Sequence, residues 1–293
     1  MFDTTLNLWL QSWSAPGLTM FMNIVSLLGY SHACIALAAI VAYAWTRRAG
    51  VALVVIVALT AGLTDIAKAA WRAPRPESVD ARVQHLSFWQ LRPGPDTASE
   101  ADAEDRFGFP SGHVAGTTAL AFGVASVVRR RWAWISAGVW IALMAVSRMY
   151  LGRHFLGDVI GGFVMGAISL AIGRRLFPRV SWLLGVGAIA VAAALFAGLP
   201  PAYDAGRLGG IALAATLLAR TDRLDARPSV TGRVLSSLLA IAIVGLAAAW
   251  DFLPYLRDSA STETPAIRLM LSALLNGAAV IVPAWAVPAR RSS

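Results

Sequence analysis

The 293-residue sequence has little charge and a single cysteine. Charged residues make up 14% of it and hydrophobic residues 57%, with a mean hydropathy of +0.64. A soluble globular domain carries roughly 25% charged residues, so this composition argues against one. With Cys34 alone, the chain forms neither an intramolecular disulfide nor a cysteine metal cluster. The first residues contain no basic segment ahead of an apolar run, and we expect no cleaved signal peptide.

The net charge of +9 does not indicate a nucleic-acid-binding protein. The basic residues form short clusters between apolar runs, which is typical of the cytoplasmic loops of membrane proteins. A nucleic-acid-binding surface would instead need a continuous basic patch or stripe.

Long apolar runs recur along the chain, and about 20 apolar residues are enough for a helix to cross a bilayer. We predict an all-α, polytopic transmembrane helical bundle. A short helix in the first residues, with Trp9 and Trp13, is expected to lie at the membrane surface. The ten spans are expected at 15–30, 32–46, 50–70, 112–128, 132–150, 156–173, 182–199, 206–220, 233–250 and 267–287.

Arginine clusters follow every second predicted span. All five clusters then fall on one side, which the positive-inside rule assigns to the cytoplasm together with both termini. The acid-rich loop 72–109 and the link 150–155 fall on the opposite side. We therefore expect a multi-pass protein of the plasma (inner) membrane, with this side facing the periplasm or the exterior.

Small residues recur near four-residue spacing in the sixth span, at Gly157, Gly161, Gly162 and Gly166. This spacing lets helices approach closely. We expect tight packing inside the bundle, with homodimerisation as the alternative.

Three polar clusters interrupt the apolar pattern, and all fall on the side of the long loop. They are KAAWRAPRP from Lys68 to Pro76, PSGH from Pro110 to His113, and SRMYLGRHFLGD from Ser147 to Asp158.

The cations of these clusters predict an anion site. Lys68, Arg75 and Arg148 lie at or near membrane depth, where charges are costly unless they are paired or face a wet cavity. Three converging cations need an anion, and phosphate suits both the planar fork of arginine and the point charge of lysine. Ser111 and Gly112 open an apolar helix, where backbone N–H groups bind anions.

Two histidines complete a two-step reaction. A neutral imidazole can attack phosphorus and form a phosphohistidine, and a second, protonated imidazole can donate to the leaving oxygen. Asp158 lies four residues after His154, so it shares a helix face with it and orients one ring nitrogen. We predict His154 as the nucleophile and His113 as the acid. His32 and His85 belong to none of the clusters and are expected to be packed residues.

Other interpretations remain open for single residues. Lys68 or Arg148 could extend toward the interface, and Asp65 could pair with Lys68. His113, His154 and Asp158 also have the ligand types of a metal site, but the surrounding cations would repel a metal ion, so we expect no metal and no other cofactor.

At these residues the sequence resembles the type 2 phosphatidic acid phosphatase superfamily. Its pattern of KxxxxxxRP, PSGH and SRxxxxxHxxxD is matched in order and spacing. The resemblance covers about residues 15–175. It implies a six-helix core without a metal, with phosphate held by Lys68, Arg75, Arg148, Ser111 and Gly112. It gives His113, His154 and Asp158 the roles derived above.

We accordingly divide the chain into a phosphatase core, residues 1–179, and a C-terminal extension of four spans, residues 180–293, whose role the sequence does not reveal. The predicted function is hydrolysis of a lipid phosphate or lipid diphosphate within the bilayer. The alternatives are transfer of the phosphate to another lipid or a sugar, hydrolysis of a soluble phosphomonoester, and a ten-span transporter or lipid-binding protein without catalysis.

Overall fold

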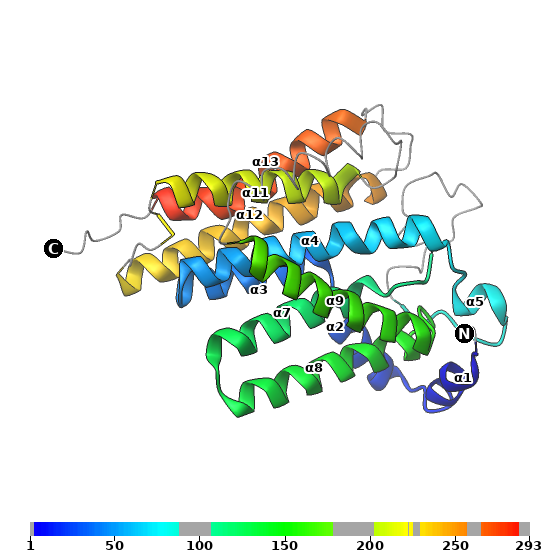
Figure 1. Ribbon diagram of the computed structural model, residues 1–293. Coiled ribbons are helices and arrows are strands. Elements are labelled where there is room, and N and C mark those ends of the chain that lie inside the picture. The colour runs from blue at the N-terminus through cyan, green and yellow to red at the C-terminus, as the bar shows by residue number, and fades with distance from the viewer. Residues whose placement is uncertain are drawn as a thin grey trace. The chain divides into compact units, whose positions relative to one another are not determined.

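The computed structural model describes residues 3–87, 107–177, 202–221, 223–224, 229–256 and 265–286, and within these ranges every regular element is a helix (Figure 1). The prediction of an all-α bundle is confirmed. The helices are α1 Thr5–Gln11, α2 Pro16–Leu27, α3 Ser31–Ala44, α4 Arg47–Trp71, α5 Pro76–Val79, α7 Gly112–Val128, α8 Arg131–Tyr150, α9 Leu156–Leu176, α11 Ala202–Arg220, α12 Val230–Leu256 and α13 Pro265–Ala286.

Four helical stretches within the described residues are long and apolar enough to cross a membrane. They are Arg47–Val79, Arg131–Tyr150, Leu156–Arg175 and Val230–Ala249. The helices α2 and α3 meet the same criterion together, with a bend of 63° between them, and would add a fifth crossing. The stretches Gly112–Val128 and Met270–Ala286 are apolar but shorter.

The predicted span 182–199 lies outside the described residues. Each of the other predicted spans falls on a helix. Within the part of the chain that the structure describes, fewer than ten helices are long and apolar enough to cross a membrane, so ten crossings stay a prediction.

Two compact units make up the chain. The first contains Met1–Ala33 and Leu63–Leu170, and the second contains Cys34–Gly62 and Ala171–Ser293. The units do not correspond to a division of the chain between residues 179 and 180. The predicted division into a core and a C-terminal extension stays a prediction. All of the predicted site residues belong to the first unit.

In the first unit, α7 and α8 form an antiparallel pair (Figure 1). The chain reverses at Arg129, which ends α7 in the left-handed conformation with φ 56°, and α8 begins two residues later. Side chains of α2, α7, α8 and α9 form the core, and α1 and α2 pack against α8. The buried core residues are Val25, Val114, Ile141, Met144, Met149 and Val159.

A glycine face brings α9 against the start of α7. A Cβ added to Gly162 would lie 2.5 Å from the carbonyl oxygen of Ser111, and one added to Gly166 would lie 2.4 Å from that of Ala115. Neither main-chain atom can yield as a flexible side chain would. The stripe expected from the sequence therefore packs inside the bundle, against a helix of the same chain.

The second unit also has helices in close contact. A Cβ added to Gly210 of α11 would lie 1.9 Å from the carbonyl oxygen of Ala273 of α13, so these two backbones approach through glycine. The hydroxyl of Tyr43 donates a hydrogen bond to the carbonyl oxygen of Val280.

Candidate active site

His154 lies in the short link between α8 and α9. Its side chain is 2% exposed. Gly152, two residues before it, turns the chain with φ 76°, and a Cβ at this position would lie 2.3 Å from the carbonyl oxygen of Gln84. Both the conformation and the close approach require glycine. The link is thus a tight turn that leads directly from α8 to His154.

Asp158 stands in the first turn of α9 and faces His154. Its Oδ2 atom lies 3.4 Å from Nδ1 of His154 and accepts a hydrogen bond of 3.0 Å from the N–H of Phe155. The hydrogen bond from Phe155 gives a partner to an N–H group at the start of α9, where N–H groups have no acceptor within the helix. The contact with His154 is longer than an ordinary hydrogen bond.

Lys68 and Arg75 come from the end of α4 and the chain after it. Lys68 lies in the last turn of α4 and is 1% exposed, and Arg75 directly precedes α5 and is 4% exposed. Nη1 of Arg75 donates a hydrogen bond to the carbonyl oxygen of Arg153 over 2.7 Å. Arg75 therefore binds the link that carries His154.

Arg148 lies in the last turn of α8, also buried. Its Nη1 donates to Oγ of Ser26 over 2.6 Å, which ties α8 to α2. Its carbonyl oxygen accepts the N–H of Arg153, so the end of α8 and the link are joined through the main chain.

The PSGH cluster forms the start of α7. Ser111 is the N-cap residue, Gly112 begins the helix, and His113 is buried beside the ring of Tyr30 at a centroid distance of 4.5 Å. The N–H of Ser111 donates to the carbonyl oxygen of Asp158 over 3.0 Å, so α7 starts beside the first turn of α9. The hydroxyl of Ser111 is buried and has no hydrogen-bond partner among the described residues.

Positive charges surround His154. Burial, followed by the charges of Arg75, Arg148, Lys68 and Arg153, lowers the pKa of His154 well below its ordinary value. An unprotonated imidazole is the form that can act as a nucleophile. The three polar clusters, far apart in the sequence, thus converge on one buried imidazole.

Arg153 is a functional candidate that the sequence analysis missed. Its side chain is 5% exposed, and its Nη1 lies 3.2 Å from Nε2 of His85 and 3.6 Å from Oε1 of Glu77. It occupies a variable position of the third motif, so nothing in the pattern distinguished it. His85, expected to be a packed residue, is a contact of this cation.

The first helix has a second face that the sequence analysis did not identify. Trp9 and Trp13 are exposed, as expected of a helix at a membrane surface, but Asn7 and Gln11 are buried. An amide of Asn7 donates to the carbonyl oxygen of His154 over 3.0 Å. The four-residue spacing of Asn7 and Gln11 places both polar side chains on one face of the helix, and this spacing could have indicated the second face from the sequence.

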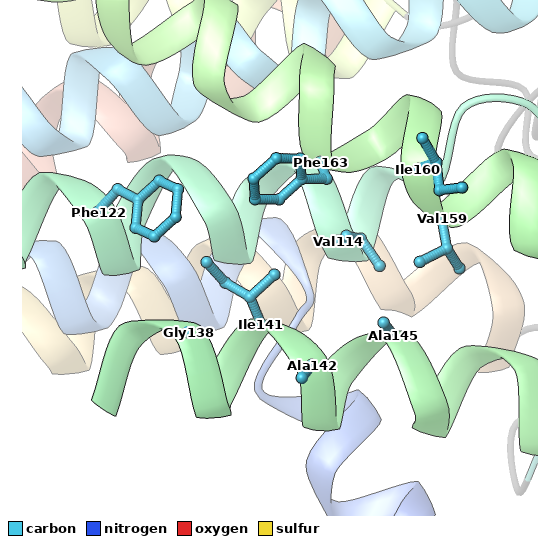
Figure 2. Close-up of a pocket in the computed structure, with 9 residues that line it drawn as sticks. All are labelled: Val114, Phe122, Gly138, Ile141, Ala142, Ala145, Val159, Ile160 and Phe163. Carbon is cyan, nitrogen blue, oxygen red and sulfur yellow. The ribbon is translucent and has the colours of Figure 1, made fainter. Parts of the chain in front are cut away.

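An apolar pocket of about 280 Å³ lies between α7, α8 and α9 in the same unit. Its walls include Phe122, Ile141 and Phe163 (Figure 2). None of the predicted site residues lines it, and every lining residue is apolar or glycine, so it offers no group that could bind phosphate.

Comparison with known families bears directly on the three motifs. Residues 49–182 match the PAP2 superfamily. The resemblance to the type 2 phosphatidic acid phosphatase superfamily is thereby confirmed for this segment, which is somewhat less than half of the chain and contains every predicted site residue. No solved structure matches the chain.

Three proteins named as phosphatases are similar to the chain over shorter stretches. A phosphatidylglycerophosphatase B of Bacillus subtilis is 35% identical over 104 residues, 32% of this chain and 51% of that protein. A lipid A 4'-phosphatase of Bacteroides thetaiotaomicron is 38% identical over 63 residues, 22% of this chain and 28% of that protein. One from Porphyromonas gingivalis is 33% identical over 96 residues, 32% of this chain and 40% of that protein. The chain therefore aligns with about half or less of the length of each relative.

Proposed function

We propose that this protein is an integral membrane phosphatase that hydrolyses a lipid phosphate or lipid diphosphate through a phosphohistidine intermediate. The observation that carries the proposal is His154, a buried imidazole with Asp158 at Nδ1 and four cations around it. Because Nδ1 faces the carboxylate, Nε2 is the nitrogen that remains for attack on phosphorus.

The first step transfers the phosphoryl group to His154. A bond forms between Nε2 and phosphorus, the bond from phosphorus to the lipid oxygen breaks, and His113 gives its proton to that oxygen. Asp158 stabilises the positive charge that develops on the imidazole. Lys68, Arg75 and Arg148 hold the phosphoryl oxygens, whose charge must be stabilised when the bonds to phosphorus are loose.

In the second step, water displaces His154. His113 accepts a proton from the water, the bond between phosphorus and Nε2 breaks, and inorganic phosphate leaves. The buried hydroxyl of Ser111 and the N–H of Gly112, at the start of α7, serve as further donors to a phosphoryl oxygen. No metal ion takes part in either step.

A lipid substrate is supported by location and by the relatives. The site lies where apolar helices end, so a head group can reach the cations while its tail stays among hydrocarbon chains. The names of all three relatives refer to phosphorylated lipids. We place the site on the periplasmic or exterior side of the plasma membrane, with both termini in the cytoplasm.

The test is phosphate release by the purified protein in detergent. The substrates are phosphatidate, phosphatidylglycerol phosphate, undecaprenyl diphosphate, a lipid A phosphate, a sphingoid phosphate and a soluble sugar phosphate. We expect release from at least one lipid phosphate, undiminished by a chelator, and a loss of about 10⁴-fold or more in His154→Ala. Equal release with and without His154 would refute the catalytic proposal, and release from the sugar phosphate alone would exclude a lipid substrate.

Adding an alcohol acceptor separates hydrolysis from transfer. If phosphate appears on the acceptor and not in solution, the protein is a phosphotransferase. A radiolabelled phosphoryl group that stays on the wild-type chain after a rapid alkaline quench, and is absent from His154→Ala, identifies the phosphohistidine.

A further inference from the structure

The helix α1 has two unlike faces. Asn7 and Gln11 lie one turn apart and share a face, and they are 0% and 9% exposed. Trp9, between them in sequence, is 57% exposed. The large majority of buried polar side-chain groups are hydrogen-bonded, so the groups that accept from the amides of Asn7 and Gln11 indicate the role of α1.

Those partners are main-chain groups next to the candidate site. Nδ2 of Asn7 donates to the carbonyl oxygens of Met149 over 2.9 Å and of His154 over 3.0 Å. Nε2 of Gln11 donates to the carbonyl oxygen of Tyr150 over 2.9 Å and to that of Gln84 over 2.6 Å. The N–H of Gln84 donates back to Oε1 of Gln11 over 2.9 Å.

These bonds complete the end of α8. The last four carbonyl groups of a helix have no helical partner. The link supplies N–H donors for Ser147 and Arg148, and Gly152 donates to Met149. For Tyr150, the donor comes from Gln11 of α1. Thus α1 caps the helix turn that carries Arg148.

The same face of α1 holds the nucleophile. Asn7 bridges Met149, at the end of α8, and His154, after the turn, so a single amide fixes the distance between them. Thr4, which precedes α1, donates to Asp80 over 2.9 Å and holds the other end of the helix against the chain after α5.

We infer that Asn7 and Gln11 are positioning residues of the active site, and that α1 acts as a clamp holding Arg148 and His154 for the reaction. The inference rests on the proposed phosphatase function. A displacement of the nucleophile by about 1 Å is enough to lower a rate by about 10²-fold. The amides touch neither substrate nor reacting atoms, so their effect passes through the main chain of residues 149–154.

The test uses three variants of the full chain in detergent. Asn7→Leu and Asn7→Asp remove the two donors at nearly constant size, and Gln11→Glu keeps the acceptor for Gln84 but loses the donors. We expect kcat to fall about 10- to 100-fold in each. Competitive inhibition by inorganic phosphate should change by less than about threefold, because the cations that bind it remain. Trp9→Ala, on the exposed face of α1, is the matched control and should keep the wild-type kcat.

Hydrogen exchange distinguishes this inference from the proposed function. Amides of residues 147–155 should exchange faster in Asn7→Leu than in the wild type or in Trp9→Ala. Faster exchange with an unchanged kcat would make the clamp merely structural and overturn the inference, as would unchanged exchange and unchanged kcat. A wild-type protein inactive on every phosphate would instead refute the proposed function, and the exchange result alone would then decide whether α1 holds the link.

Discussion

Nδ1 of His154 lies 3.4 Å from Oδ2 of Asp158, and the same carboxylate oxygen accepts the N–H of Phe155. Asp158 thus caps α9 and faces His154, so the start of the helix sets the distance between the carboxylate and the imidazole. The main chain adds a further constraint, because the carbonyl oxygen of Asp158 accepts the N–H of Ser111 at the start of α7. Substitution of Asp158 therefore tests the centre of the site.

Asp158→Asn should lower kcat by about 10²- to 10⁴-fold while the protein stays folded. The amide keeps the shape but cannot stabilise the positive charge that develops on His154, and it favours the wrong tautomer. Initial rates on the best lipid phosphate measure the effect, with thermal unfolding as the check on folding. A variant with wild-type kcat would remove Asp158 from the mechanism.

His113→Asn should affect substrates according to their leaving groups. A lipid alkoxide needs a proton, and loss of a general acid costs about 10²- to 10⁴-fold. An aryl phosphate with an acidic phenol needs little protonation, so its hydrolysis should fall much less. The ratio of the two rates is the measurement, and His154→Ala is the control because it should abolish both. Equal losses for both substrates in His113→Asn would contradict the role of general acid.

Arg153→Met should move the acid limb of the pH profile. Burial and nearby cations lower the pKa of His154, so its imidazole stays neutral at pH values below the ordinary pKa of histidine. Removing one of these charges makes protonation easier. The pKa of His154 then rises, and the fall of kcat/KM on the acid side begins at higher pH. Profiles of both proteins, fitted with the same substrate, test the direction, and a shift toward lower pH would contradict it.

Gly166→Ala should destabilise the protein, and Gly138→Ala is its matched control. The added methyl at residue 166 would meet the main chain of Ala115, and such overpacking costs about 1–3 kcal/mol. Nothing lies within 4 Å of a Cβ at residue 138, where alanine should be neutral or stabilising by up to about 1 kcal/mol. Thermal unfolding in detergent should rank Gly138→Ala at or above the wild type and Gly166→Ala several degrees below it.

The helices and the chemical groups were predictable because each leaves a pattern in the sequence. Hydropathy located α4, α8 and α9, since a span must be apolar along its whole length. Lys68, His113 and His154 stood out because charged and titratable side chains are costly in such a setting. Their spacing within motifs then predicted which of them belong together.

The arrangement of helices was not predictable in the same way. Hydropathy shows which segments are apolar but not which of them pack together, so the two compact units, each built from separated parts of the chain, left no signal. Arg153 looked like any other arginine in a link. Its burial against His85 and Glu77 depends on the fold of residues 77–87, which carry no periodic pattern.

The bonds from α1 end on main-chain oxygens of residues 149, 150 and 154. Every residue type, proline and glycine included, presents the same carbonyl group, so the hydrogen bonds to the amides do not depend on which side chains stand at positions 149 and 150. Pairwise covariation between the positions of α1 and residues 149–154 would consequently not reveal this contact. Homologues could retain it while their links diverge, and a search for its equivalent must look for a buried amide pair four residues apart ahead of the first span.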